Sequence, residues 1–278
     1  MANTIFNPAT YTLRSLSDNI KRGDIALPEL QRPFVWANTK VRDLFDSMYR
    51  GFPVGYLLFW ETGAEVEARQ IGTDGKEAKI ARLLIVDGQQ RLTSLYSVLE
   101  GVSVVREDYS DSRVQLAFRP RDSHFSVRDA TTDRNPEFLK DISQLWVEYR
   151  GTVRKFFGDY EAARGSLDTE TRDRWEDALD HVRDLENYPF SVLVLDSSVS
   201  EEAVAEVFTR INYEGVRLNQ ADFILTLMSV FWEEGRKQLE GFARGCKLPS
   251  RSGPSPFNWY IAPSPDQMLR VSVALAFK

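Results

Sequence analysis

Five consecutive polar residues, Asp87–Arg91 (Asp-Gly-Gln-Gln-Arg), separate two apolar patterns in this chain. The apolar run 83–86 predicts a buried strand, and the helical spacing of apolar residues over 92–100 predicts a helix. The first N–H groups of a helix lack helical partners and carry partial positive charge, so a strand-to-helix turn of this kind can bind an anion. We therefore expect Asp87–Arg91 to line a pocket.

Each side chain of this turn suits chemistry on phosphate groups. Gly88 lets a ligand approach the backbone, and Arg91 can hold phosphate oxygens with its planar guanidinium. Gln89 or Gln90 could orient an attacking water, and Asp87 is the nearest carboxylate for a metal ion or a water. Because a positive side chain at a helix start opposes the helix dipole, we expect Arg91 to contribute little to folding. The alternative is an ordinary strand-to-helix turn with a polar start.

A second polar pair, Gln31 and Arg32, lies in an apolar context between Pro28 and Pro33. The prolines predict an extended backbone there. The pair could face a ligand or simply bond to a neighbouring loop. The flanking apolar residues, which could form a pocket wall or pack into the core, are Leu30, Phe34 and Trp36.

The elements that must position these residues follow from hydrophobic periodicity. Strands are predicted at 54–60, 83–86, 114–118 and 190–195, and a hairpin or loop at 63–79. Helices are predicted at 11–22, 41–48, 92–100 and 266–277, in the charge-rich stretch 137–188, and after the caps Ser200 and Asn219. The fold class is therefore α/β (α+β), with a core at 1–135, a helical insertion at 136–189, and a last core strand and helical part at 190–278. The final helical pattern runs to the last residues, so we expect a piece of a longer polypeptide.

Composition excludes several classes of protein. With 278 residues and 42% hydrophobic residues, the chain can bury a large core. The single cysteine, Cys246, excludes an internal disulfide and a thiolate zinc cluster, and His124 and His181 form no recognisable metal-nuclease motif. The apolar runs are too short to span a bilayer and no leader opens the chain, so we expect a cytoplasmic protein.

The net charge of −6 argues against a long basic DNA groove. The strongest basic bias is interleaved with acids, which favours a solvated mixed-charge surface over a DNA groove. Its arginines are Arg113, Arg119, Arg121, Arg128 and Arg134. Neither a Gly-x-x-x-x-Gly-Lys-Ser/Thr loop nor a Gly-x-Gly-x-x-Gly motif occurs, so Asp87–Arg91 is the candidate phosphate cradle.

Four motifs in order resemble the N-terminal domain of GmrSD-type modification-dependent restriction enzymes, a family that includes the phosphorothioate-sensing SspE group. The motifs are 27–36 (LPELQRPFVW), 46–55 (DSMYRGFPVG), 87–91 (DGQQR) and 208–218 (FTRINYEGVRL), within about residues 10–232. The resemblance implies a ParB/sulfiredoxin-like core with a small mixed sheet. In that fold, the loop corresponding to Asp87–Arg91 binds nucleotide phosphates.

The resemblance also implies a set of site residues. Asp87, Gln89, Gln90 and Arg91 would be catalytic, with Mg²⁺ held by Asp87. The residues expected to bind the nucleotide are Gly88, Arg91, Thr93, Gln31, Arg32 and Asn212, with Arg32 lying across the pocket from Arg91. By itself, Asn212-x-x-Gly215 is an ordinary turn. The residues expected around a DNA modification are Leu30, Gln31, Phe34 and Trp36.

The resulting functional expectation is an NTPase sensor domain of an anti-phage restriction protein. It would use Mg²⁺ with GTP, ATP or CTP, sense phosphorothioate or modified-cytosine DNA, and control a nuclease in a C-terminal domain or partner subunit. Nuclease activity is not expected from this chain alone, and the sequence leaves a homodimer open. The alternative is a non-hydrolysing module that binds nucleotide or modified DNA and regulates a partner nuclease.

Overall fold

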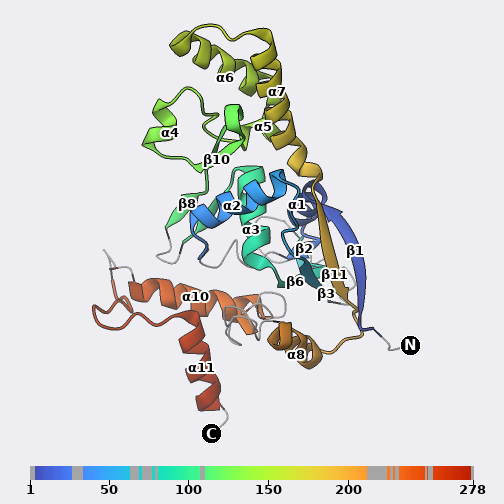
Figure 1. The fold of residues 1–278 in the computed structure, drawn as a ribbon. Helices are drawn as coiled ribbons and strands as arrows, with labels where there is room; N and C mark the ends of the chain where they lie inside the picture. Colours follow the sequence, from blue (N-terminus) through green and yellow to red (C-terminus); the bar gives the residue numbers. More distant parts are fainter. Residues whose placement is uncertain are drawn as a thin grey trace.

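The computed structural model has an α+β fold built on one mixed five-stranded sheet, which confirms the predicted class (Figure 1). It describes residues 4–26, 34–62, 69–70, 77–78, 81–106, 110–211, 224–225, 228, 232–247, 249 and 253–276. In spatial order the strands are β1 (Phe6–Thr12), β11 (Pro189–Leu195), β3 (Leu57–Glu61), β6 (Leu83–Asp87) and β2 (Ile25–Ala26). The strand that carries Asp87 therefore lies inside the sheet.

The sheet combines parallel and antiparallel strand pairs. β11 runs parallel to β3 and β2 parallel to β6, whereas the pairs β1–β11 and β3–β6 are antiparallel. The predicted strands at 83–86 and 190–195 are confirmed. The strand predicted from 54 begins only at Leu57, because Gly55 has a φ of 84° and the backbone turns there.

Strand β1 is not predicted by the sequence pattern, because it is an edge strand with mostly exposed side chains and no apolar run. Its last two residues, Tyr11 and Thr12, fall within the helix predicted at 11–22. That helix, α1 (Leu13–Arg22), begins two residues later than predicted, and the Thr12 side chain caps it by accepting the N–H of Ser15 at 3.1 Å.

Three helices pack on one face of the sheet: α1, α2 (Asn38–Tyr49) and α3 (Gln89–Glu100). Buried side chains from β3 and β6, such as Phe59 and Ile85, share one apolar cluster with Leu95 of α3. Helix α8 (Glu201–Ile211) covers the other face through Val204 and Phe208. β6 is thus buried on both faces, which explains its uninterrupted apolar run.

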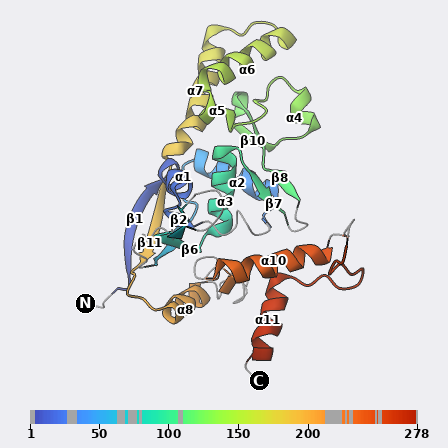
Figure 2. The ribbon, with the colours of Figure 1, turned by 180° about the vertical axis from the view of Figure 1, so that it is seen from behind.

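A mostly helical segment continues from this core between α3 and β11. It contains the hairpins β7 (Ser103–Val105)–β8 (Asp111–Arg113) and β9 (Leu116–Arg119)–β10 (His124–Val127), short 3-10 turns at Pro120–Asp122 and Leu185–Asn187, and helices α4 (Ala130–Arg134), α5 (Gln144–Val147), α6 (Tyr149–Arg164) and α7 (Thr169–Asp184). The strand predicted at 114–118 is β9, shifted by two residues at its start. Figure 2 shows α6 and α7 projecting beyond α1–α3.

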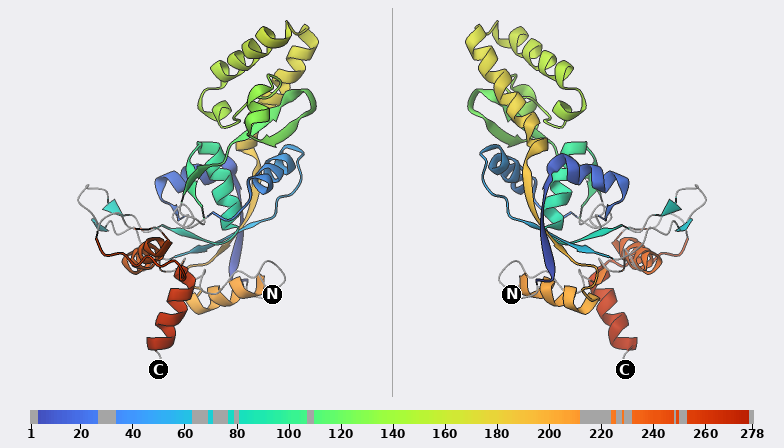
Figure 3. Two further views of the ribbon diagram at one scale, coloured as in Figure 1. Left: turned by 90° about the vertical axis from the view of Figure 1, so that its left-hand side faces the viewer. Right: turned by 90° about the vertical axis from the view of Figure 1, so that its right-hand side faces the viewer.

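The C-terminal helices lie at the opposite end of the molecule from α6 and α7 (Figure 3). They are α10 (Glu233–Lys247) and α11 (Pro265–Ala276), the second matching the helix predicted at 266–277. Two short strands, β4 (Arg69–Gln70) and β5 (Glu77–Ala78), pair as the hairpin expected within 63–79. Among the residues described, no helix has the length and apolarity needed to cross a bilayer.

Candidate functional site

The turn between β6 and α3 has the predicted strand-to-helix geometry. Gly88 has φ 92° and ψ 14°, α3 begins at Gln89, and the N–H of Leu92 bonds to the carbonyl of Gly88 at 2.9 Å. A Cβ at residue 88 would lie 2.5 Å from Cδ2 of Leu57 on β3 and 3.7 Å from its Cα, so a side chain there would have to displace the buried Leu57 side chain. Glycine is therefore favoured both by the positive φ and by the packing of Leu57 against it.

An irregularity in the sheet lies immediately before this turn. Leu58 pairs with Asp87, whereas the next residue, Phe59, pairs with Ile85, so Val86 has no partner of its own on β3. An extra residue of this kind bends a strand and redirects the side chains that follow it. The bulge therefore helps to bring Asp87 out of the buried sheet at the start of α3.

All five residues of the turn line one cavity, as the sequence predicts. The cavity has a volume of about 150 Å³, and its other described lining residues are Val86 and Trp36. This volume suits a phosphate group and is below the range of about 300–1,000 Å³ that is typical of pockets enclosing a whole small molecule. Trp36 brings the end of the motif 27–36 to the same cavity.

The two glutamines hold the walls of this cavity. The side-chain oxygen of Gln90 accepts the backbone N–H groups of Val35 and Trp36, both at 3.2 Å. The side-chain nitrogen of Gln89 donates to the carbonyl of Ile85 at 3.2 Å. Gln90 therefore joins α3 to a segment more than 50 residues earlier in the chain, and Gln89 fastens the helix start to β6.

Arg91 contacts the residues that lead into β3. Its Nη1 donates to the carbonyl of Tyr56 at 2.7 Å, and its guanidinium lies against Gly55, where an added Cβ would be 3.1 Å from Nη2. A hydrogen bond to a charged group contributes about 1.5–3 kcal/mol. Arg91 therefore lines the cavity and also fastens α3 to the start of β3, a contact that argues for a larger contribution to folding than its position at a helix start suggests.

Arg106 positions the Trp36 side of the cavity. Its Nη1 donates to the carbonyl of Trp36 at 2.9 Å, Nη2 bonds to the side chain of Asn38, and its guanidinium lies 4.9 Å from the centre of the Phe34 ring. The ammonium group of Lys40 lies 4.2 Å from the centre of the Trp36 ring. One cation therefore lies over the ring of Trp36, and a second, Arg106, holds the Trp36 backbone and lies over the buried ring of Phe34.

The remaining predicted site residues fall into two groups. Phe34 is 1% exposed and belongs to the core, so the structure supports core packing for it rather than a place in a pocket wall. Thr93, expected to bind nucleotide, is buried on α3 and is not among the described residues that line the cavity. Four predicted residues lie outside the described part of the chain: Leu30, Gln31, Arg32 and Asn212. The predicted placement of Arg32 across from Arg91 therefore stays a prediction.

The sequence pattern does not indicate Arg106 or the partners of Arg91. Arg106 is an isolated arginine in a polar stretch, and no local pattern distinguishes it from a surface residue. The position of Gly55 in the motif 46–55 was a signal, because a glycine before a buried strand often marks a close backbone approach. The Tyr56 partner is a carbonyl, which every residue has, so side-chain types could not reveal it.

The arginines between 113 and 134 are largely paired with acids, as the mixed-charge interpretation predicts. Four of the five form ion pairs within the described structure: Arg113–Asp141, Arg119–Asp122, Arg121–Glu137 and Arg128–Asp133. The Asp122 carboxylate accepts both Nε and Nη2 of Arg119 at 2.7 Å, and this contact lowers the pKa of Asp122. Pairing of this kind weakens any attraction of these arginines for a phosphate backbone.

Comparison with known proteins assigns the chain to a family. The family described as "GmrSD restriction endonuclease, N-terminal domain" matches residues 13–229, which include the β6–α3 turn. A relative from Methanocaldococcus jannaschii, "Uncharacterized protein MJ0686", is 21% identical over 274 residues, covering 88% of this chain and 46% of the relative. The chain thus spans about half the length of that relative. Because the family match covers most of the chain, the protein belongs to the GmrSD restriction endonuclease N-terminal domain family.

Proposed function

We propose that this chain is the nucleotide-binding and hydrolysing sensor domain of a modification-dependent restriction protein. The observation that carries the proposal is that all five residues Asp87–Arg91 line one cavity at the N-terminus of a buried helix. A helix that begins directly after a glycine favours the binding of phosphate oxygens, because the N–H groups of its first turn and the positive end of its dipole are directed at the ligand.

Each group in the turn has a role in this proposal. The backbone at Gly88 and Gln89 receives a terminal phosphate, and the guanidinium of Arg91 neutralises part of its charge. The side chains of Gln89 and Gln90 orient the phosphate and a water for attack. Trp36, the last residue of the motif 27–36, lines the cavity, so a ligand bound there would contact the motif that contains Gln31 and Arg32.

The chemistry of Asp87 fits the Mg²⁺ that accompanies a nucleoside triphosphate. Mg²⁺ takes oxygen ligands and is usually held by one or two carboxylates together with substrate phosphates. Asp87 supplies one carboxylate on the cavity lining. The ion, when bound, would neutralise phosphate charge, while Asp87 would hold it beside the turn.

Membership in a restriction endonuclease family supports a role in DNA restriction. We propose that the domain responds to phosphorothioate or modified-cytosine DNA and passes this signal to a nuclease in another domain or subunit. GTP, ATP and CTP are all candidates for the nucleotide. A homodimer would be compatible with this scheme.

The test is phosphate release from GTP, ATP and CTP with Mg²⁺, with and without modified DNA. Asp87→Asn should abolish release, whereas Asp173→Asn, the same charge change at an exposed position on α7, should leave it unchanged. Calorimetric titration with each nucleotide then distinguishes a domain that binds without hydrolysing from one that does not bind. Saturable binding without release would identify a non-hydrolysing regulatory module, and failure to bind any of the three nucleotides would overturn the proposal.

A further inference from the structure

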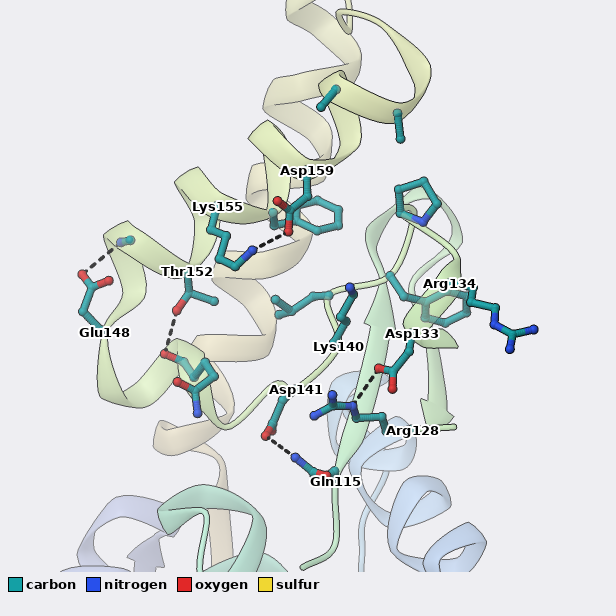
Figure 4. Close-up of a pocket in the computed structure, with 18 of the residues that line it drawn as sticks. Gln115, Arg128, Asp133, Arg134, Lys140, Asp141, Glu148, Thr152, Lys155 and Asp159 are labelled. Carbon is teal, nitrogen blue, oxygen red and sulfur yellow. Dashed lines mark hydrogen bonds and ion pairs between the residues drawn. The ribbon is translucent and has the colours of Figure 1, made fainter. Parts of the chain in front are cut away.

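A second and larger cleft lies in the helical segment, away from the β6–α3 turn. Its volume is about 1150 Å³. One wall is α6, which contributes Thr152, Lys155 and Asp159, and the other is the chain around α4, which contributes Asp133 and Lys140 (Figure 4). The cleft is large enough for a ligand of nucleotide size.

The acidic side chains of this cleft already have partners. Three carboxylates form ion pairs: Asp133 with Nε of Arg128 at 2.8 Å, Asp141 with Nη2 of Arg113 at 3.0 Å, and Asp159 with Nζ of Lys155 at 2.7 Å. Glu148 accepts the backbone N–H of Gly151 at 2.9 Å, which leaves its charge in place. Because three of these four carboxylates are ion-paired, the acids oppose an incoming anion less than their number suggests.

Two basic side chains of the cleft, Arg134 and Lys140, are exposed and form no ion pair with any described residue. Figure 4 shows Lys140 extending into the space that Lys155 enters from the opposite wall, and Arg134 directed outward at the rim. In addition, Arg128 engages Asp133 only through Nε. The wall around α4 therefore presents two cations that no described carboxylate pairs with, in a chain whose net charge is −6.

Apolar side chains lie next to these cations. Phe138, Leu139 and Phe156 line the cleft and are 8%, 7% and 4% exposed, respectively. Pro136, Ala162 and Ala163 add small apolar surfaces. Cations beside an apolar lining suit a ligand that joins a phosphate to an apolar, planar group.

We propose that this cleft binds a nucleotide unit through its phosphate, either as a free nucleotide or within a DNA strand. Lys140 and Arg134 would contact the phosphate, with Arg128 behind them, and the apolar lining would contact the sugar or the base. This site is separate from the β6–α3 turn, and the inference does not depend on nucleotide binding at that turn.

The test uses the whole chain and a charge-reversed variant, Arg134→Glu/Lys140→Glu. Both side chains are exposed, so the variant should fold. The matched control is Arg150→Glu/Arg154→Glu, which makes the same charge change at exposed positions on α6 outside the cleft. The probes are a fluorescein-labelled single-stranded oligonucleotide, its labelled duplex, and a fluorescent GTP analogue, each titrated by anisotropy at several salt concentrations.

We expect the cleft variant to bind at least one probe about tenfold more weakly than the control, because it loses charge-assisted bonds to phosphate. For a single-stranded oligonucleotide, the slope of log affinity against log salt should become shallower by roughly 0.7 for each phosphate that the variant no longer neutralises. Weaker binding of oligonucleotide or duplex identifies a DNA phosphate, and weaker binding of the GTP analogue identifies a free nucleotide.

Three outcomes would overturn the proposal: equal binding of all probes by the two variants, an equal loss in both, or no saturable binding by the wild type. A Gln90→Ala variant separates this inference from the proposed function. That variant should lose GTP-analogue binding at the β6–α3 turn, and a loss caused by the cleft variant on a Gln90→Ala background would belong to the cleft alone.

Discussion

At the scale of single residues, the candidate site depends on glycines that let other groups approach. Gly88 admits Leu57 of β3, and Gly55 admits the guanidinium of Arg91. Both glycines have positive φ, so each satisfies a conformational and a spatial requirement at once. The turn was recognisable from its sequence because its side chains are distinctive, but the partners of those side chains are set by the tertiary fold.

Gly88→Ala should destabilise the protein more than a change at an open glycine. Gly23 provides the control, because it has a φ of 77° and no atom within 4 Å of an added Cβ. Gly23→Ala should cost about 1–2 kcal/mol of unfolding free energy, the cost of a left-handed conformation. Gly88→Ala should cost clearly more, because the 2.5 Å approach to Leu57 must also be relieved. Urea denaturation of both variants measures the difference, and equal losses would contradict a close approach of β3.

Arg91→Ala should lower both stability and nucleotide affinity. The loss of the hydrogen bond to the Tyr56 carbonyl should reduce the free energy of unfolding by about 1–2 kcal/mol, below the full range for a bond to a charged group because the side chain is partly exposed. Nucleotide binding should weaken by about tenfold to a hundredfold, since a charge-assisted bond to phosphate is removed. Urea denaturation and calorimetric titration at a temperature where the variant is folded check the two effects separately. Unchanged affinity would make Arg91 a purely structural residue.

At the scale of elements, capping side chains determine where several helices begin. Asp168 accepts the N–H of Thr171 at 2.8 Å at the start of α7, and Asp129 forms a capping box at the start of α4. Ser200, the predicted cap of α8, accepts the N–H of Ala203 at 3.3 Å. These contacts are local in the sequence, so they could be anticipated more readily than the contacts around Arg91.

The cap of α7 should make stability depend on pH in the acid range. The backbone hydrogen bond from Thr171 lowers the pKa of Asp168 below its ordinary value of 3.8. A carboxyl group with a depressed pKa in the folded state stabilises that state above its unfolded pKa, and the contribution disappears as the pH falls through the folded pKa. Asp168→Asn keeps a capping side chain but removes the titration. Melting temperatures measured from pH 6 downward should therefore fall less steeply for Asp168→Asn below about pH 4 than for the wild type, and identical curves would show that this cap does not contribute.

How well an element was predicted depended on its burial. β6 and β11 have clear apolar patterns, so their bounds match the prediction to within one residue. Helix α3 begins at Gln89, three residues before the predicted start at 92, because its first residues are the polar Gln89–Arg91 rather than part of the apolar pattern. Strand β1 exposes most of its side chains, and backbone hydrogen bonds to β11 hold it in the sheet. Because any residue type can form such bonds, no sequence pattern indicates this strand. The same reasoning applies to the cleft beside α6: its lining residues come from several segments, and only the fold brings them together.

At the scale of the whole molecule, one apolar cluster joins the sheet to the helical segment. It includes Ile85 of β6, Leu95 of α3, and Trp175 and Leu179 of α7. A separate small cluster, consisting of Leu225, Met228 and Leu269, holds α11. The sequence suggested a boundary near residue 136, but the buried contacts are continuous across it. The segment 136–189 should therefore unfold together with the sheet.

Two leucine truncations test this continuity. Leu179→Ala in α7 should cost about 2–5 kcal/mol, as expected for a fully buried leucine, and should speed amide hydrogen exchange in α3 as much as in α7, because both helices open only when the shared cluster does. Leu269→Ala, the same truncation in the small cluster, should speed exchange in α11 while leaving α3 unchanged. If Leu179→Ala instead leaves the protection of α3 intact, then residues 136–189 form a unit that opens by itself. The cleft beside α6 and the pocket at the β6–α3 turn would then belong to parts of the molecule that fold independently.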